Sequence, residues 1–370
     1  MTGIADLRTP AAVIDLDRLE RNAHWARDKT ARLGVHLRPH VKTHKCIEIA
    51  RLQHGGSTGP VAVSTLAEAA FFASAGFRDL TYAVPIAPQK LPAAAEIARS
   101  VDRLHLLVEH PETVAAVASF AAAHDVVLSL MIEVDCGGDR TGIDPSDPGW
   151  VNVAQAIHAS PDLDLAGVLT HAGQAYRCRS RAEAAEVALD ESATAAALAD
   201  RLRTAGVGVP EVSVGSTPTF AAAAELSGVT EVRPGNYVLC DAFQWAIGSC
   251  AVDDIALSVV TRVISARRGT VVVDAGSLAL STDRGPVHVD PEWGYGVVCD
   301  LSGQPIENAR LGALSQEHGV IRWPSPVLPA PGDPLRILPN HSCLTAACHP
   351  TYHVARGEEI VDEWYPCRGW

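Results

Sequence analysis

The sequence predicts an α/β protein that consists of a TIM-like (β/α)8 barrel followed by an all-β domain, and three observations lead to this prediction. Short β-branched runs alternate with longer Ala-rich helical stretches over roughly the first 240 residues. Polar motifs follow the ends of six of the expected strands, as the loops at the mouth of a barrel do. After about Leu239 the Ala-rich helices stop, and short strands between Gly and Pro turns replace them.

The barrel elements follow from the pattern of apolar residues along the chain. An opening extended segment leads into a first helix, for which Asp15 is the expected N-cap. Its apolar face has helical spacing and comprises Leu16, Leu19, Ala23, Ala26 and Leu33. Strands are then expected at 35–39, 61–64, 80–84, 103–108, 126–134, 163–170, 211–214 and 230–233. Helical stretches such as 89–100, 111–124 and 181–205 separate them. A doubly wound open sheet would show the same alternation, and the polar motifs after the strand ends favour the barrel.

The rest of the chain is expected to form one further domain. Its predicted strands lie at 256–265, 269–274, 319–321, 334–337 and 352–356. The acidic pairs Glu358-Glu359 and Asp362-Glu363 are expected at a solvated edge. We therefore expect a barrel over residues 15–240, and a β domain over residues 241–370 that the opening residues 1–14 join.

Composition and charge exclude several classes of protein. The chain has 370 residues, of which 47% are hydrophobic and 20% charged, so long disorder and a coiled coil are not expected. A net charge of −13 disfavours nonspecific binding to nucleic acid or to an anionic membrane. We find neither a spanning apolar stretch nor a secretory signal. Nine dispersed cysteines without a CxxC pair favour a reducing cytoplasm.

The basic motif RPHVKTHK follows the first barrel strand. It places three cations and two imidazoles within eight residues. A basic surface turn has the same composition, but a solvated face is not expected directly after a buried strand. Lys42 lies nearest to the strand end, and neighbouring cations favour its neutral amine, which is a usable nucleophile. Lys45 is expected to begin the next helix.

The motif GSTPT follows the seventh strand and has the features of a phosphate-binding turn. Gly215 lets the backbone approach a ligand, Ser216 and Thr217 offer hydroxyl groups, and the N-terminus of a helix attracts an anion. A Ser/Thr helix cap with a nearby Pro gives the same pattern without a ligand. The motif RPGNY after the eighth strand favours phosphate, with Arg38 and Arg233 expected at the same mouth. An imine-forming lysine and a phosphate site together indicate pyridoxal 5'-phosphate (PLP).

The motif PNHSC lies in the second domain. In an extended segment, residues i and i+2 point to the same face, so His341 and Cys343 can reach one ion. Imidazole with thiolate favours zinc, whereas a buried His and a small buried Cys would need no metal. A rival set of Cys343, Cys348, His349 and His353 has zinc-like spacing. Its last three members are expected in a turn and a strand, where they need not converge.

Taken together, these motifs resemble those of the fold-type III PLP enzymes, and within them the D-serine dehydratase/D-threonine aldolase family, which has an alanine-racemase-like barrel. The resemblance rests on TPAAVIDLDRLERN, RPHVKTHK, VST, EVDCGGDRTG, HAGQAY, VGSTPT, EVRPGNYVLCD and PNHSC. These segments run from Thr9 to about Gly369, so the resemblance covers essentially the whole chain. The combination of RPHxKTHK with PNHxC is more specific than either motif alone.

The resemblance implies a role for each candidate residue. Lys42 would be the Schiff-base lysine, with His171 lining its pocket and Arg140 and Tyr176 near the cofactor ring or the substrate. We expect Lys42, His171 and Tyr176 to be the catalytic residues. The phosphate is implied at Gly215, Ser216, Thr217, Gly235, Asn236 and Tyr237. Members of the family carry a metal at the position of His341 and Cys343, so Zn²⁺ is expected, with another divalent metal such as Mn²⁺ as the alternative. Leu344 stands where the family more often has Pro.

The implied reaction is that of a lyase on D-configured β-hydroxy amino acids. Dehydration of D-serine to pyruvate and ammonia ranks first, because dehydratases resemble PNHxC whereas the aldolases more often place Asp where Cys343 stands. Metal-dependent cleavage of the D-threonine type, to glycine and an aldehyde, is the alternative. An amino-acid racemase and a noncatalytic PLP-binding protein are the further alternatives. The resemblance also suggests a homodimer whose second domain helps to close the partner's barrel mouth.

Overall fold

The computed structural model describes residues 3–138 and 140–370, and the chain folds into two compact units. The first, here called the barrel unit, comprises Trp25–Gly235 and Cys367–Trp370. The second, the β unit, comprises Met1–His24 and Asn236–Pro366. Helix α1 (Leu16–Leu33) contributes residues to both, and the Asp15 carboxylate accepts a bond from the Arg18 amide at its start, as expected of an N-cap. Among the described residues, we find no helix of the length and apolarity that a membrane span requires.

The barrel unit is built on an eight-stranded parallel sheet with the order β2-β9-β8-β7-β6-β5-β4-β3. Its strands are β2 (His36–Leu37), β3 (Val61–Val63), β4 (Asp79–Pro85), β5 (Arg103–Val108), β6 (Leu128–Val134), β7 (Leu163–Thr170), β8 (Glu211–Val214) and β9 (Glu231–Val232). A parallel bridge joins His40 to Ala62, and the Ala62 amide donates to the Pro39 carbonyl at 2.9 Å. These contacts connect the two ends of the strand order, so the predicted (β/α)8 barrel is confirmed.

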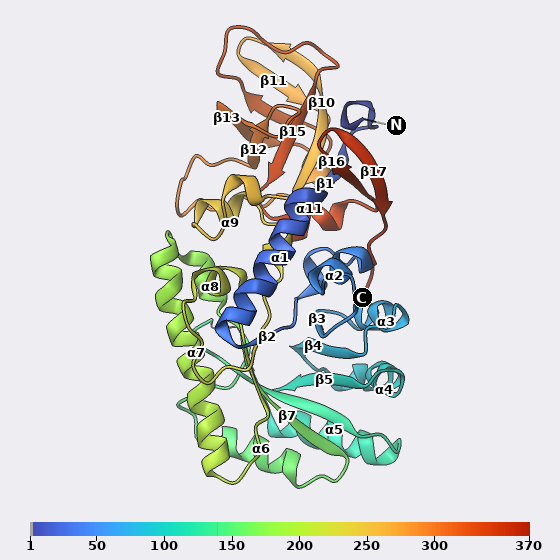
Figure 1. The fold of residues 1–370 in the computed structure, drawn as a ribbon, viewed down its shortest axis with the longest axis vertical. Helices are drawn as coiled ribbons and strands as arrows, with labels where there is room; N and C mark the ends of the chain where they lie inside the picture. The colour runs from blue at the N-terminus through green and yellow to red at the C-terminus, as the bar shows by residue number, and fades with distance from the viewer. Residues whose placement is uncertain (1–2, 139) are drawn as a thin grey trace. The chain divides into compact units, whose positions relative to one another are not determined.

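Helices follow the strands and surround the barrel (Figure 1). They are α2 (Ile47–Gln53), α3 (Leu66–Ser74), α4 (Leu91–Ser100), α5 (Pro111–Ala123), α6 (Trp150–His158), α7 (Arg181–Thr204) and the short α8 (Thr217–Ala222). Helix α7 buries Ala184, Ala188, Ala195 and Leu198 at intervals of three to seven residues, which puts them on one face of the helix. Small alanine side chains on that face let the helix approach the strands closely.

The β unit contains a nine-stranded sheet with the order β11-β14-β13-β12-β15-β10-β1-β16-β17. Its strands are β1 (Ala11–Asp15), β10 (Leu257–Arg267), β11 (Thr270–Val273), β12 (Gly296–Cys299), β13 (Pro305–Leu314), β14 (Gly319–Arg322), β15 (Pro334–Pro339), β16 (Tyr352–Arg356) and β17 (Glu359–Trp364). Strand β10 also pairs with β11, so the strands from β11 to β10 close on themselves. Three short helices accompany them, α9 (Ala242–Ala246), α10 (Ser277–Leu280) and α11 (Ser342–Cys348).

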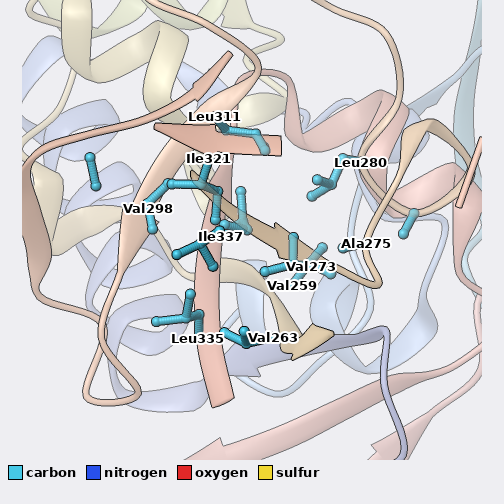
Figure 2. Packing of buried hydrophobic residues seen from close by; sticks show 13 residues of the cluster. Val259, Val263, Val273, Ala275, Leu280, Val298, Leu311, Ile321, Leu335 and Ile337 are labelled. Carbon is cyan, nitrogen blue, oxygen red and sulfur yellow. The ribbon is translucent and has the colours of Figure 1, made fainter. Parts of the chain in front are cut away.

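The core of the β unit is a cluster of aliphatic side chains inside this closed sheet (Figure 2). Val259, Val273, Val298, Leu311 and Ile337 come from five different strands and are fully buried. Burial of each such side chain stabilises the folded state by about 1.5–3 kcal/mol. The cluster thus gives the unit a hydrophobic core of its own, and β15, which leads into Asn340 and His341, contributes Leu335 and Ile337 to it.

Two features of the β unit bear on the sequence predictions. Strand β1 pairs antiparallel with β10 and parallel with β16, so the opening segment forms part of the sheet of the β unit. Strands β12, β13 and β17 were not expected. Strands β13 and β17 are largely exposed and carry polar side chains without a clear apolar alternation. The expected acidic edge is confirmed, since β17 is the last strand of the sheet and Glu359, Asp362 and Glu363 are exposed.

Candidate active site

Lys42 lies at the mouth of the barrel, in a 3-10 turn (Val41–Thr43) that follows the end of β2. Its positive charge is among the causes that lower the pKa of His40 and of His171, so these three side chains share one neighbourhood. His171 follows β7, and its carbonyl partner Gly215 follows β8. The three strands therefore deliver Lys42, His171 and Gly215 to the same end of the parallel sheet.

The two imidazoles near Lys42 are neutral. Burial lowers the pKa of His171 to about 3, and the charges of Lys42, Arg140 and Arg233 contribute to this shift. Burial, with Lys42 next in strength, also holds the pKa of His40 well below its ordinary value. The Nδ1 atom of His171 lies 3.1 Å from the Gly215 carbonyl oxygen, which can only accept. Nδ1 therefore carries the proton, and Nε2 presents a lone pair.

A buried carboxylate on α7 connects the loops that follow β7 and β8. The Glu191 Oε1 atom accepts from the Ala172 amide at 3.0 Å and from the Gly215 amide at 2.9 Å. Glu191 is 1% exposed, and burial raises the pKa of its carboxyl group despite these bonds. Because Ala172 adjoins His171, one side chain fixes both the candidate catalytic imidazole and the candidate phosphate turn.

The backbone of the candidate phosphate turn is closely packed at its two glycines. Gly215 has a φ of +124°, and a Cβ atom there would lie 2.9 Å from the Arg233 nitrogen. A Cβ atom at Gly235 would lie 2.8 Å from the His40 carbonyl oxygen. Ser216 caps α8 by accepting from the Thr219 amide at 3.3 Å, so the capping alternative is confirmed for its hydroxyl. The phosphate role of Gly215, Ser216 and Thr217 stays a prediction.

Two expectations about the basic motif are wrong. Arg38 does not face the mouth: its guanidinium binds Glu231 at 2.6 Å and Asp79 at 2.5 Å. Both carboxylates belong to residues that begin strands, at the opposite end of the barrel, because Arg38 extends back into the polar barrel interior. Lys45 does not begin a helix either, since α2 starts at Ile47 and the Lys45 ammonium pairs with Glu68 at 3.0 Å. A φ of +52° at Lys45 shows why the chain turns there.

The remaining barrel candidates lie on loops at the same end. Arg140 follows β6 and is exposed, and its positive charge contributes to the lowered pKa of His171. Tyr176 is half-buried in a 3-10 turn (Gly173–Arg177) after β7. Arg233 is buried, and its guanidinium donates to the Ser213 hydroxyl at 2.5 Å and to the Thr170 carbonyl. Arg233 is thus held by the barrel interior rather than extended toward solvent.

His341 and Cys343 adjoin one another in the β unit, but not for the expected reason. They do not alternate along a strand, because β15 ends at Pro339 and α11 begins at Ser342. His341 is the N-cap of α11 and Cys343 lies in its first turn. Burial lowers the pKa of His341, but hydrogen bonds to Asp283 and Cys343, together with the charges of Cys343 and Asp241, raise it overall, to about 11. The strand-to-helix turn therefore brings the imidazole and the thiol into contact.

Two aspartates support this pair. The His341 Nδ1 atom lies 3.0 Å from the Asp283 Oδ2 atom, in the loop between α10 and β12. Asp241 is buried and accepts from the Ser342 amide at 2.9 Å, which fixes the first turn of α11. The Asn236 side-chain amide donates to Asp241 at 2.6 Å and to the Ser342 hydroxyl. The phosphate roles implied for Asn236 and Tyr237, which belong to the β unit, stay predictions.

The rival zinc set does not assemble. Cys348 is exposed at the end of α11, His349 bonds the Ala279 carbonyl at 2.8 Å, and His353 pairs with Glu363 at 3.0 Å. Within the described parts of the chain, no three His, Cys, Asp or Glu side chains are arranged to hold a metal ion. A metal on His341 and Cys343 would thus have two protein ligands, with other positions left to water or substrate.

Sequence reasoning missed the supporting carboxylates. For Glu191 a signal existed, because it is an acid on the otherwise small and apolar face of α7 that includes Ala188 and Ala195. Nothing in the sequence distinguishes Asp283 from other loop aspartates, because its role depends on a loop meeting the end of β15 across 58 residues.

The described residues fit both predicted groups. At the barrel mouth, the buried His40 Nδ1 atom has no hydrogen-bond partner among the described residues, and the positive charge of Lys42 lies near this imidazole. In the β unit, Asp283 takes Nδ1 of His341, which leaves Nε2 as the nitrogen that can bind a metal, and the Cys343 thiol contacts the same imidazole, a donor pair that suits zinc. PLP thus fits the barrel mouth, and a metal fits the β unit.

Comparisons with known proteins cover both units. Residues 14–242 match the family model described as alanine racemase, N-terminal domain, and residues 256–355 match the one described as putative serine dehydratase domain. The D-threo-3-hydroxyaspartate dehydratase of Delftia sp. (strain HT23) is 40% identical, over 98% of this chain and 98% of that protein. The D-serine dehydratase of Dictyostelium discoideum is 32% identical, over 99% and 98%. The D-threonine aldolase of Arthrobacter sp is 28% identical, over 98% and 92%.

Solved structures show the same likeness. That of the Delftia dehydratase superposes with a TM-score of 0.95 at 39% identity, over 100% of both chains. Another solved structure of a D-threo-3-hydroxyaspartate dehydratase is a cysteine-to-alanine mutant in the metal-free form. The similarity therefore extends over the entire chain rather than over the barrel alone.

Proposed function

The chain belongs to the D-serine dehydratase/D-threonine aldolase family of fold-type III PLP enzymes, and we propose that it is a lyase that removes water from D-configured β-hydroxy amino acids. The observation that carries dehydration, rather than carbon–carbon cleavage, is the contact between the His341 imidazole and the Cys343 thiol. The family resemblance associates a thiol at this position with dehydratases. The Delftia and Dictyostelium relatives, at 40% and 32% identity, are dehydratases, which supports the same choice.

The residues of this chain divide the work in two. When bound, PLP supplies an electron sink for charge at the α-carbon and zinc supplies a Lewis acid for the leaving hydroxyl. Lys42 would hold the cofactor until the amino group of the substrate replaces it, and its released amine would then take the α-proton, while neutral His40 and His171 add no competing positive charge beside it. Gly215, Ser216 and Thr217, with Gly235, Asn236 and Tyr237, hold the phosphate; Arg140 and Tyr176 orient cofactor and substrate. His341 and Cys343 hold the metal.

The balance of the proposed reaction identifies its products. The substrate loses the α-proton and the β-hydroxyl group as water, and the released enamine takes up water and gives ammonia and a 2-oxo acid. D-Serine would yield pyruvate, and D-threo-3-hydroxyaspartate would yield oxaloacetate. We propose D-serine as a substrate and include the hydroxyaspartate, because a relative that is 40% identical carries its name. We also propose that the protein is a homodimer and that it is cytoplasmic. The nine free cysteines support the cytoplasmic location and do not bear on the dimer.

A substrate panel tests the proposal. Zinc-loaded protein is incubated with D-serine, D-threo-3-hydroxyaspartate and D-threonine, and ammonia, 2-oxo acids, glycine and aldehydes are measured with and without a chelator. We expect a 2-oxo acid and ammonia in equal amounts, loss of both with chelator, and recovery with added zinc. Glycine and aldehyde without a 2-oxo acid would establish the aldolase alternative. Racemisation alone, or cofactor absorbance that no D-amino acid changes, would replace the lyase by a racemase or a noncatalytic PLP-binding protein.

A further inference from the structure

We infer that Asp283 is a positioning residue for the metal: it holds His341 through Nδ1 and thereby presents Nε2, without binding the ion itself. This inference rests on the proposed metal role of His341 and Cys343. The contact is a 3.0 Å approach of the His341 Nδ1 atom to the Asp283 Oδ2 atom. Because a carboxylate can only accept here, the proton of the contact lies on Nδ1.

The Asp283 carboxylate is itself held in place. Its other oxygen, Oδ1, accepts from the Gly285 amide at 2.6 Å, so its two oxygens have different partners. With Oδ1 held by the backbone and Oδ2 held by the imidazole, the carboxylate has little freedom to turn away from His341.

The loop that carries Asp283 is tied to the strand that leads into His341. The Asn340 side-chain amide donates to the Asp283 carbonyl at 2.9 Å and to the Gly294 carbonyl at 3.0 Å. The Asn340 oxygen accepts from the Trp293 indole at 2.8 Å. Asn340, directly before His341 and 2% exposed, thus fastens both ends of this loop to the end of β15. This gives the Asn of the PNHSC motif a physical role.

Such an arrangement is what a metal-binding histidine needs. An outer carboxylate that accepts from one ring nitrogen fixes the tautomer and the ring orientation, and it makes the other nitrogen a better ligand. Removing such a partner weakens metal binding by about 10–100-fold. The same loss is not expected of Asp290, which lies in the same loop and pairs with Arg310 at 3.9 Å.

The test measures the zinc dissociation constant by competition with chelators, in the holoenzyme with PLP bound. We compare the wild type with Asp283→Ala and with the matched control Asp290→Ala, each also in a His341→Ala and in a Cys343→Ala background. We expect Asp283→Ala to weaken zinc binding about 10–100-fold in the wild-type and Cys343→Ala backgrounds. With His341 removed, the same substitution should change zinc affinity less than about 2-fold. Asp290→Ala should have no more than that small effect in any background.

The other outcomes overturn the inference. An equal loss with and without His341 would make Asp283 a direct ligand or a source of long-range charge. An unchanged zinc affinity in Asp283→Ala would remove its role, whereas a wild type that does not bind zinc would overturn the proposed metal site itself. Asp283→Asn serves where the alanine variant does not fold, because the amide oxygen can still accept a bond. Its loss should stay below about 10-fold, since a neutral acceptor replaces a charged one.

Discussion

The two units place histidine in opposite electrostatic surroundings. In the barrel unit, burial and the charge of Lys42 lower the pKa of His40 and His171, so both rings are neutral. In the β unit, hydrogen bonds to Asp283 and Cys343 raise the pKa of His341 to about 11, against the effect of burial. A neutral ring adds no positive charge beside the Lys42 amine, whereas the proton that His341 holds next to Asp283 and Cys343 occupies a place that a metal cation can take. The difference suggests that cofactor chemistry and metal chemistry are prepared separately.

The largest effect that would test this separation is expected at Lys42. Lys42→Ala should lower dehydratase activity by about 1000-fold or more, because it removes both the covalent anchor and the base. It should also abolish the attachment of PLP by borohydride reduction, yet leave zinc affinity within about 2-fold. Lys90→Ala, which removes an exposed lysine of the same unit, is the control and should retain activity. Zinc loss in Lys42→Ala would show that the two sites are not separate.

The next effect concerns the carboxylate that fixes the barrel loops. Glu191→Ala should lower the free energy of unfolding by about 2–4 kcal/mol, because the buried amides of Ala172 and Gly215 lose a charged acceptor. It should also weaken PLP binding, measured by dialysis and absorbance, while zinc affinity in the β unit is unchanged. Glu191→Gln keeps an acceptor oxygen and should lose less. The control is Glu186→Ala, a more exposed position on the same helix; a loss as large there would contradict the role of Glu191.

The pH dependence of folding stability tests the same contrast between lowered and raised histidine pKa values, with His44 as the example from the barrel unit. Burial lowers the pKa of His44 to about 3 from an ordinary 6.5, so between these values the unfolded chain binds a proton that the folded chain does not. Stability must therefore fall as the pH drops below about 6.5, by at most about 1.4 kcal/mol per pH unit. For metal-free His341 the sign is reversed: its contribution is present below 6.5 and is lost as the pH rises toward 11.

Urea unfolding of the wild type and of His44→Gln at pH 7, 6, 5 and about 4.5 measures this effect. Burial raises the pKa of carboxyl groups such as Glu133 and Glu191, which titrate with the opposite sign, so only the difference between the two proteins is informative. The stability advantage of the wild type should shrink steadily below about pH 6.5. A constant difference over this range would show that His44 takes up a proton in the folded chain.

Much of the barrel could be predicted because its elements are locally encoded. The alternation of β-branched strands with Ala-rich helices marks α7 to within one residue of its observed end, and the polar motifs mark the strand ends. Arg38 shows where this reasoning stops. Its position in the motif is that of a mouth residue, but three acids at the starts of β4, β8 and β9 draw its side chain into the barrel. Such long-range ion pairs leave no local pattern.

In the candidate site of the β unit, the pairing of two residues could be predicted, but their local structure and their supporting residues could not. The sequence indicated that His341 and Cys343 act together, yet assigned them to a strand, whereas they lie on a strand-to-helix turn. The pairing survives because side chains at an N-cap and in the first turn are neighbours in space. Asp283 and Asn340 could not be recognised, since their roles arise where a loop meets the end of β15.

The smallest expected effect distinguishes the two cysteines of α11. Cys343 adjoins His341, whereas Cys348 is exposed at the end of the helix and its thiol donates to the Leu344 carbonyl at 3.3 Å. Cys348→Ser should change the free energy of unfolding by no more than about 0.5 kcal/mol and leave zinc stoichiometry and affinity as in the wild type. Cys343→Ser, measured alongside by the same chelator competition, should lose zinc affinity. A loss with Cys348→Ser of similar size would mean that the metal uses the rival set, and that the contact with His341 does not define the site.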